Sequence, residues 1–231
     1  MKLTNRLQAV ADYIKKGSTV ADIGTDHGYL PVYLIENKIA KHVYACDINK
    51  GPLDAAISQI KTNKMSDFIT PILSNGLDGL KEKHVDQIVI AGMGGVLIGE
   101  ILKNNLSIVK EVDSLILQPM TGQAELRVFL LENGFEILEE NLAKEKKRMY
   151  QVILAKYTGL KGAKLKTLEY HIGKSIIDKK HPLLINLISN LERKWRKILI
   201  ECSVCDSEEG IKKIEEAKEM ISEIEEVRKC L

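Results

Sequence analysis

Strand and helix signals alternate over residues 1–160, and this alternation limits the possible folds more than any other feature. Short apolar segments of strand length lie at residues 18–25, 42–48, 68–74, 87–93 and 114–119. Helical patterns lie between them, at residues 4–14, 29–37, 51–63, 95–105 and 122–134. Strands that alternate with helices build a parallel sheet with helices on both faces. We therefore predict an α/β fold of this kind.

Two further strand patterns close this region, at residues 135–145 and 148–157, and a charged turn joins them. Strands joined by so short a turn pair antiparallel. We expect them to add antiparallel character at one edge of the sheet. Pro71 lies within the third strand and predicts an edge or irregular position for it, because proline cannot donate a hydrogen bond to a neighbouring strand.

Beyond these strands every periodic pattern is helical. Apolar residues spaced by three and four form one stripe that begins at Leu184 and a second that begins at Ile214. Two long amphipathic helices joined near residues 205–210 predict an antiparallel, coiled-coil-like helical hairpin. We predict two domains, an α/β domain over residues 1–160 and a helical domain over residues 161–231.

Charge is unevenly distributed, although the whole chain carries 34 basic and 32 acidic side chains. Residues 161–197 carry ten basic and three acidic side chains, whereas residues 198–231 carry five basic and ten acidic ones. This pattern fits two helices that pair with each other, and it fits equally well a basic surface that binds a polyanion. Charge alone does not choose between the two.

The sequence shows no signal that would direct the protein to a membrane or out of the cell. No apolar run reaches the length of a membrane span, and the N-terminal segment lacks the apolar stretch of a signal peptide. We therefore expect a cytoplasmic protein.

Cys202 and Cys205 form a single CxxC, but no second pair or histidine pair lies nearby. We expect reduced thiols there rather than a zinc site.

The turn after the first strand carries the most informative residues. Gly24 lets the backbone turn close to a ligand, and Gly28 opens the next helix, whose free N–H groups form a polar cradle. The spacing is not G-x-G-x-x-G, and Asp26 places negative charge where a dinucleotide pyrophosphate would lie. A nicotinamide-dependent oxidoreductase is therefore disfavoured. A ligand with positive charge fits better, and S-adenosylmethionine has a sulfonium and an amino-acid group.

Loops after later strands extend this candidate site, because ligands of such folds bind at the carboxyl ends of the strands. Asp47 lies 23 residues after Gly24, close to the spacing of about 20 for a ribose-binding acid, although turn aspartates are also common. The loop with Asn75 either contacts an adenine edge or is an ordinary turn. The residues predicted to hold the cofactor are Asp22, Gly24, Thr25, Asp26, Asp47, Ile48, Asn75, Gly76, Gly92 and Met93.

Five segments taken in order resemble one family, the bacterial tRNA (adenine(22)-N(1))-methyltransferases. They are "ADIGTDHGYLP", "ACDINKGPL", "NGLDGL", "AGMGG" and "LQP". That family also has a C-terminal coiled-coil hairpin, so the resemblance covers essentially the whole chain. It implies a Rossmann-like class I methyltransferase sheet with S-adenosylmethionine as cofactor, and methylation of N1 of adenine 22 in tRNA. Thr25 and Gly28 replace the serine and alanine common in the family, and both remain small.

Three side chains of the first loop are candidates for catalysis. Methylation of N1 leaves positive charge on the ring, and Asp26 is the candidate carboxylate that stabilises it, or else it only binds the cofactor. His27 either holds the base or a phosphate or caps the local backbone. Tyr29 is a candidate for stacking on a flipped base. The chain has no "NPPY" motif of the exocyclic-amine methyltransferases, which argues against methylation of N6.

The partner that the resemblance implies is tRNA, and phosphate contacts should supply most of its affinity. Arg6 resembles the N-terminal arginine of the family and is a candidate contact to RNA or to the carboxylate of the cofactor. The other candidate RNA contacts are Lys144, Lys147, Arg148, Arg193, Lys194, Arg196 and Lys197. We expect a monomer that needs no metal and no obligate protein partner.

Two other functions stay open from the sequence. One is a methyltransferase that acts on another RNA, a protein or a small molecule, with the hairpin as a partner-binding arm. The other is a non-catalytic module that binds nucleic acid or a partner. Incorporation of labelled methyl into tRNA separates the first from the main hypothesis, and binding of S-adenosylmethionine separates the second.

Overall fold

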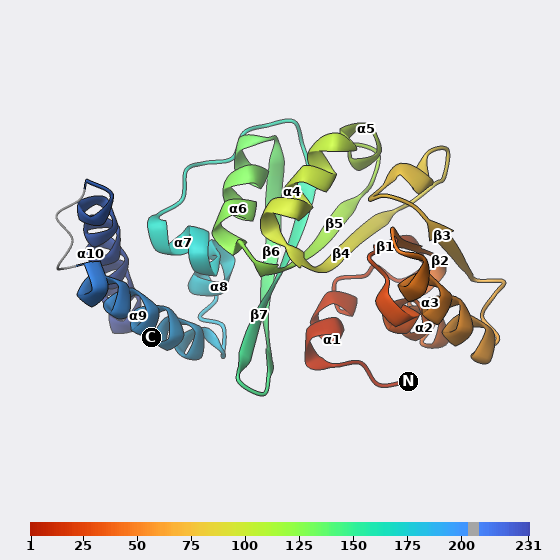
Figure 1. Ribbon diagram of the computed structural model, residues 1–231, viewed down its shortest axis with the longest axis horizontal. Coiled ribbons are helices and arrows are strands. Elements are labelled where there is room, and N and C mark those ends of the chain that lie inside the picture. Colours follow the sequence, from red (N-terminus) through yellow and green to blue (C-terminus); the bar gives the residue numbers. More distant parts are fainter. Residues whose placement is uncertain (203–207) are drawn as a thin grey trace. The chain divides into compact units, whose positions relative to one another are not determined.

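The structure, a computed structural model, describes residues 1–202 and 208–231. Its contacts divide the chain into two compact units, residues 1–163 and residues 164–231. The first unit is a sheet with helices on its two faces, and the second is helical (Figure 1). The α/β fold class with a C-terminal helical pair is confirmed. The division into two independently folding domains stays a prediction.

Seven strands form the sheet of the first unit. They are β1 (Ser18–Ile23), β2 (Ala40–Asp47), β3 (Ile69–Leu73), β4 (Gln87–Gly94), β5 (Ser114–Thr121), β6 (Phe135–Glu145) and β7 (Arg148–Tyr157). Their order is β3-β2-β1-β4-β5-β7-β6. The first five strands are parallel to one another, and β7 is antiparallel to both β5 and β6. Strand β3, which contains Pro71, lies at an edge as predicted.

Helices cover both faces of this sheet. One core cluster contains residues of α1 (Asn5–Ala11), α2 (Tyr29–Glu36) and α3 (Lys50–Thr62), and the other contains residues of α4 (Gly95–Asn104), α5 (Leu106–Val109) and α6 (Gln123–Glu132). The short helices η1 (Asp26–Gly28) and η2 (Asp78–Leu80) lie in the loops. No helix in the described part of the chain has the length and apolar character needed to span a membrane.

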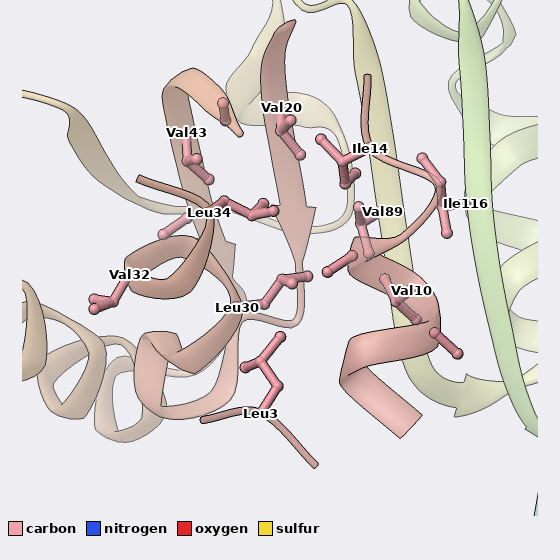
Figure 2. Close-up of a cluster of buried hydrophobic side chains, with 14 of the residues drawn as sticks. Leu3, Val10, Ile14, Val20, Leu30, Val32, Leu34, Val43, Val89 and Ile116 are labelled. Carbon is pink, nitrogen blue, oxygen red and sulfur yellow. The ribbon is translucent and has the colours of Figure 1, made fainter. Parts of the chain in front are cut away.

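Each central strand contributes to both cores, because neighbouring residues of a strand point to opposite faces. Val89 packs in the cluster that contains α1 and α2, whereas Ile88 and Ile90 pack with α4 and α6. Figure 2 shows the first cluster, where Val89 of β4 lies near Val10 of α1, and Val20 of β1 lies near Ile14 and Leu34. Burial on both faces explains why these strands are continuous apolar runs rather than alternating patterns.

The β6–β7 hairpin returns the chain to the edge of the sheet where the parallel strands end. Because β7 is antiparallel to β5, its first residues lie at that edge. Pairing of β6 with β7 continues to Glu145 and Arg148, beyond the last β5–β7 pair at Leu117 and Ile153. Figure 1 shows the hairpin as a long two-stranded ribbon. Its turn therefore lies on the side of the sheet that carries the predicted ligand loops.

A buried ion pair ties α6 to this hairpin. Nε of Arg127 donates to Oε1 of Glu140 at 2.7 Å, and Nη2 of Arg127 donates to Oε1 of Gln151 at 2.6 Å. The side chains of Arg127 and Glu140 are 0% and 2% exposed. Either charge alone would be costly at such a site, so the pair fixes the position of the hairpin against the helix.

The described residues of the second unit form four helices, α7 (Thr167–Ile172), α8 (Lys174–Asp178), α9 (Leu184–Cys202) and α10 (Glu208–Lys229). Helices α9 and α10 pack antiparallel, since Arg228 of α10 pairs with Glu192 of α9, while Glu225, one turn earlier on α10, pairs with Arg196, one turn later on α9. The predicted helical hairpin is confirmed. Cys202 ends α9, whereas Cys205 lies outside the described residues, so the predicted state of the CxxC is not tested.

Candidate functional site

The turn after β1 packs tightly against two neighbouring strand ends. Gly24 has a φ of +75°, and the N–H groups of Gly24 and Thr25 donate to the carbonyl of Cys46 on β2, at 2.8 and 3.0 Å. A Cβ on Gly24 would meet Cε of Met93 on β4, the flexible end of a side chain that can move aside. The positive φ is therefore what favours glycine here. The turn presents bare backbone to the space beside it.

A cleft of ≈ 580 Å³ opens beside this turn. Its volume lies within the range of about 300–1,000 Å³ that is usual for small-molecule sites. The lining comes from α1, from the turn after β1, from the ends of β4 and β5, and from the β6–β7 hairpin. The lining residues are Thr4, Arg6, Leu7, Asp22, Gly24, Thr25, Asp26, Tyr29, Leu30, Ala91, Gly92, Met93, Met120, Glu145 and Tyr150.

Asp22 contributes a buried carboxyl group to the cleft, with 5% of the residue exposed. Burial raises the pKa of this carboxyl to about 6, with a smaller raising effect from Asp47, while Thr25 and Arg6 lower it. The Thr25 hydroxyl oxygen is itself buried, and none of the described residues offers it a hydrogen bond of good geometry. Two polar groups are thus held at the bottom of the cleft where a ligand can complete their hydrogen bonds.

Arg6 of α1 brings positive charge to the same cleft. Its Nη1 donates to Oε1 of Gln118 at 2.8 Å, and its guanidinium carbon lies 5.9 Å from the centroid of the Tyr150 ring. Gln118 on β5 is fully buried. The guanidinium therefore donates to a neutral amide, and its charge also acts on the nearby carboxyl groups of Asp22 and Glu145, whose pKa values it lowers.

A second carboxylate, Glu145, lies at the end of β6 and lines the cleft. Its Oε1 accepts the backbone N–H of Arg6 at 2.8 Å. Partial burial alone raises the pKa of the Glu145 carboxyl, but the Arg6 N–H, the Thr4 hydroxyl and the charges of Arg6 and Lys146 outweigh this and lower it. Glu145 is therefore an oriented, ionised carboxylate at neutral pH.

Two of the three candidate catalytic residues, Asp26 and Tyr29, line the cleft, whereas His27 lies next to Asp26 but outside the lining. The side chains of Asp26 and His27 are 72% and 55% exposed, and Nε2 of His27 lies 3.4 Å from Oδ1 of Asp26. His27 has a φ of +57°, which turns the chain into α2. The Tyr29 ring is 5.6 Å from the His27 ring, between centroids, and Tyr29 is 46% exposed. Two adjacent rings are thus presented to solvent beside the opening.

The remaining predicted cofactor residues lie at the ends of β2 and β3, outside the lining of the cleft. Asp47 is buried, and its Oδ1 accepts the N–H of Asn49 at 2.8 Å. Ile48 and Asn75 are exposed, and Gly76 has a φ of +55°. The Cys46 carbonyl that receives Gly24 and Thr25 precedes Asp47 directly. These residues therefore continue the surface from the turn after β1 toward the edge of the sheet.

A family model described as a methyltransferase domain matches residues 3–153, the span that supplies every residue of the cleft. The chain belongs to this methyltransferase domain family. The tRNA (adenine(22)-N(1))-methyltransferase of Bacillus subtilis (strain 168) is 36% identical over 155 residues. That match spans 67% of this chain and 65% of the length of the relative.

Solved structures of methyltransferases match nearly the whole chain. The B. subtilis m1A22 tRNA methyltransferase TrmK has a TM-score of 0.85 at 28% identity, covering 98% of each chain. M. capricolum TrmK, solved with the cofactor product S-adenosylhomocysteine, has a TM-score of 0.85 at 29% identity, covering 97% of this chain and 99% of that one. The resemblance of the sequence to this family of tRNA methyltransferases is confirmed.

The lining of the cleft contains some of the residues predicted from the sequence and others that were not predicted. Six of the predicted cofactor residues line it, namely Asp22, Gly24, Thr25, Asp26, Gly92 and Met93. Arg6, proposed first among the RNA contacts, also lies in the lining. Sequence reasoning missed Glu145 and Tyr150. The signal for them was the antiparallel hairpin, which returns to the carboxyl edge of the sheet and brings its end residues with it.

The other predicted RNA contacts are exposed. Lys144, Lys147 and Arg148 surround the turn of the β6–β7 hairpin, and the Lys144 carbonyl accepts the side-chain amide of Asn5 at 2.9 Å. On α9, Arg196 pairs with Glu192 at 2.8 Å and Lys197 pairs with Glu201 at 3.6 Å. Arg193 and Lys194 are also exposed on α9.

The buried Asp22 carboxyl makes the stability of the protein depend on pH. Its pKa is about 6 when folded, mainly because of burial, and about 4 when unfolded. The folded state binds the proton more tightly, so this stabilising contribution is complete below about pH 4 and is lost as the pH rises through about 6. Two pKa units correspond to about 3 kcal/mol.

We expect Asp22→Asn to remove this pH dependence. Urea unfolding measured between about pH 4 and pH 7 should show the free energy of unfolding of the variant rising relative to that of the wild type as the pH increases. Parallel curves for the two proteins would show that the Asp22 carboxyl has the same pKa in the folded and unfolded states, contrary to this prediction.

Proposed function

We propose that this protein transfers a methyl group from S-adenosylmethionine to N1 of an adenine in tRNA, at position 22. The observation that carries the proposal is the cleft of the first unit, where a buried carboxyl, an arginine and bare glycine backbone converge. The names of the relatives supply the substrate and the position. A monomer located in the cytoplasm, where tRNA is available, is part of the proposal.

The cleft fits the amino-acid end of this cofactor. The Asp22 carboxyl suits an ammonium group, and the Arg6 guanidinium suits a carboxylate. The buried Thr25 hydroxyl can complete its hydrogen bonding on the ligand. Gly24 and Gly92, with φ values of +75° and +87°, contribute backbone without side chains to the lining beside these groups. Asp47, at the end of β2, suits the ribose hydroxyls.

Asp26, Tyr29 and the adjacent His27 suit the acceptor base. Bound S-adenosylmethionine supplies an electrophilic methyl group, which N1 of adenine takes with its lone pair while the electrons of the broken C–S bond stay on sulfur. Positive charge thereby moves to the purine without any proton transfer. Asp26 stabilises this charge, and Tyr29 stacks on the base while His27 holds the base or a phosphate. Orientation of the adenine is the main task of these side chains.

The basic side chains contact the tRNA backbone in this proposal. Lys144, Lys147 and Arg148 lie around the hairpin turn near the cleft lining, and they bind phosphates next to the target base. The α9 residues Arg193, Lys194, Arg196 and Lys197 bind the body of the tRNA. Salt bridges to Glu192 and Glu201 must then compete with RNA for two of these four.

The test of the proposed function uses the full-length protein, methyl-labelled S-adenosylmethionine and unmodified tRNA. The expected product is N1-methyladenosine at position 22, identified by nuclease digestion and mass spectrometry. A control tRNA with guanine at that position should take up no label. Absence of label from any tRNA would refute the proposed substrate, and label at another nucleotide would refute the proposed position.

Asp26→Ala tests the role of the exposed carboxylate in the lining of the cleft. Because Asp26 is largely exposed, water screens its charge, and we expect a loss of about tenfold in the single-turnover rate at saturating cofactor. Asp54→Ala, which removes an exposed carboxylate on α3, is the matched control and should leave the rate unchanged. A wild-type rate for Asp26→Ala would contradict charge stabilisation by this residue.

A further inference from the structure

Two carboxylates besides Asp26 line the cleft, and they lie in different parts of the sheet. Asp22 ends β1, on the side that carries the glycine turn and the predicted cofactor residues. Glu145 ends β6, with β4, β5 and β7 between it and β1 in the strand order. A ligand group near Glu145 therefore lies beside α1 and the β6–β7 hairpin, and not beside the predicted ribose and adenine sites at the ends of β2 and β3.

Glu145 is held more firmly than Asp26. Its Oε1 accepts the N–H of Arg6 at 2.8 Å, and the Thr4 hydroxyl also lies close enough to lower the pKa of the carboxyl. The residue is partly buried, whereas the Asp26 side chain is 72% exposed. A fixed carboxylate in a partly dry cleft interacts more strongly with a ligand charge than a solvated one does. A carboxylate also has more than one acceptor position, so one is left for a ligand.

We propose that Glu145 accepts a hydrogen bond from the 6-amino group of the target adenine and stabilises the positive charge that methylation places on the purine. This inference rests on the proposed function. In N1-methyladenine the charge is shared between N1 and the adjacent 6-amino nitrogen, so a carboxylate at that amine strengthens its interaction as methyl transfer proceeds. Tyr150 and Met120 supply apolar surface beside Glu145 in the lining.

The same contact discriminates between purines. Guanine carries a carbonyl oxygen at position 6 and cannot donate a hydrogen bond there, so an ionised Glu145 would repel it. Sites built to bond a donor reject analogues that lack it, because the buried acceptor is then left unpaired. Glu145 is therefore a specificity-determining residue as well as a catalytic residue.

The test combines one substitution with one change in the RNA. Glu145→Gln keeps a side-chain oxygen that can accept the Arg6 N–H, and it removes the charge. Its kcat/KM is compared with that of the wild type on tRNA with adenine at position 22 and on the same tRNA with purine, which lacks the 6-amino group. Glu136→Gln, an exposed residue near the start of the same strand, is the matched control. Affinity for S-adenosylmethionine and the melting temperature report on folding and cofactor binding.

With adenine, Glu145→Gln should lower kcat/KM by about 10–100-fold, as expected for loss of a hydrogen bond to a charged group. On tRNA with purine at position 22, the kcat/KM of the variant and that of the wild type should differ by less than about threefold, because the amine that Glu145 contacts is already absent. Cofactor affinity and melting temperature should match those of the wild type. Equal losses on both RNAs, or no loss on adenine, would overturn the assignment.

If neither protein methylates tRNA with purine at position 22, a binding experiment tests the proposal instead. Inosine at position 22 replaces the amine by a carbonyl, and the tRNA then acts as a competitor. The wild type should bind it more weakly than adenine tRNA. The side-chain amide introduced by Glu145→Gln can donate to the carbonyl, so the variant should lose this preference. The same preference in both proteins overturns the proposal. Failure of the wild type to methylate adenine tRNA refutes the proposed function itself.

Discussion

A chain that ends at residue 163 is expected to bind S-adenosylmethionine as the full-length protein does and to lose tRNA methylation by about a hundredfold or more. Every residue that lines the cleft lies within residues 1–163, so cofactor binding should survive. The lost part contains Arg193 and Lys194, exposed on α9, and hence part of the proposed tRNA contact. Cofactor affinity by calorimetry and methyl incorporation into tRNA measure the two effects.

The truncated chain ends at residue 163, where the first unit ends, and not at residue 160, the boundary predicted from the sequence. The N–H of Gly162 donates to the carbonyl of Leu131 at the end of α6, so residues 161–163 pack on the first unit. A full-length Arg193→Glu, Lys194→Glu variant serves as the control, because it alters the basic surface and keeps the helices. Full methylation by the truncated chain would refute the docking role of the helical unit. Loss of cofactor binding would refute the division into two independent domains.

Replacing Arg127 by methionine is expected to lower the free energy of unfolding by about 3–5 kcal/mol. The substitution leaves the Glu140 carboxylate buried, 2% exposed, without the partner that now lies 2.7 Å away. It also removes the donor to Gln151. Urea unfolding followed by circular dichroism measures the change, and the cleft should be affected too, because the same hairpin carries Glu145.

Two further variants show that the buried pair is the cause. Arg148→Met, at an exposed position on the same hairpin, should change stability by less than about 0.5 kcal/mol. A double variant, Arg127→Met with Glu140→Leu, should recover most of the stability lost in the single one, because no unpaired charge remains. If Arg127→Met costs no more than Arg148→Met, the ion pair does not hold the hairpin.

Local patterns predicted most of the sheet. Strands β6 and β7 begin and end at the predicted residues, because both are alternating or apolar runs bounded by a glycine and a charged turn. The edge position of β3 followed from the single residue Pro71. The glycine turn after β1 was also predicted, from Gly24 and Gly28, and the charge of Asp26 and the lack of a G-x-G-x-x-G spacing disfavoured a dinucleotide loop there. Each of these signals lies within a few residues of the feature it predicts.

Other parts of the site depend on pairs of residues that are far apart in the chain. Arg6 and Gln118 are 112 positions apart, and nothing near either residue indicates that they meet. The burial of Arg127 was equally hidden, because an arginine in an amphipathic helix is usually exposed. Glu145 could have been inferred only by combining the antiparallel hairpin with the rule that ligands bind at the carboxyl edge of the parallel strands.

The strand order of the sheet has a consequence for synthesis on the ribosome. Strand β6 is made before β7, yet β7 lies between β6 and β5, so β6 cannot take its place until β7 has emerged. Arg6 and Glu145, which meet in the cleft, are 139 positions apart. A nascent chain thus carries the glycine turn early but completes the cleft only when nearly all of the first unit has left the exit tunnel. Formation of the site is therefore a late event in folding, slowed by the closure of its longest loops.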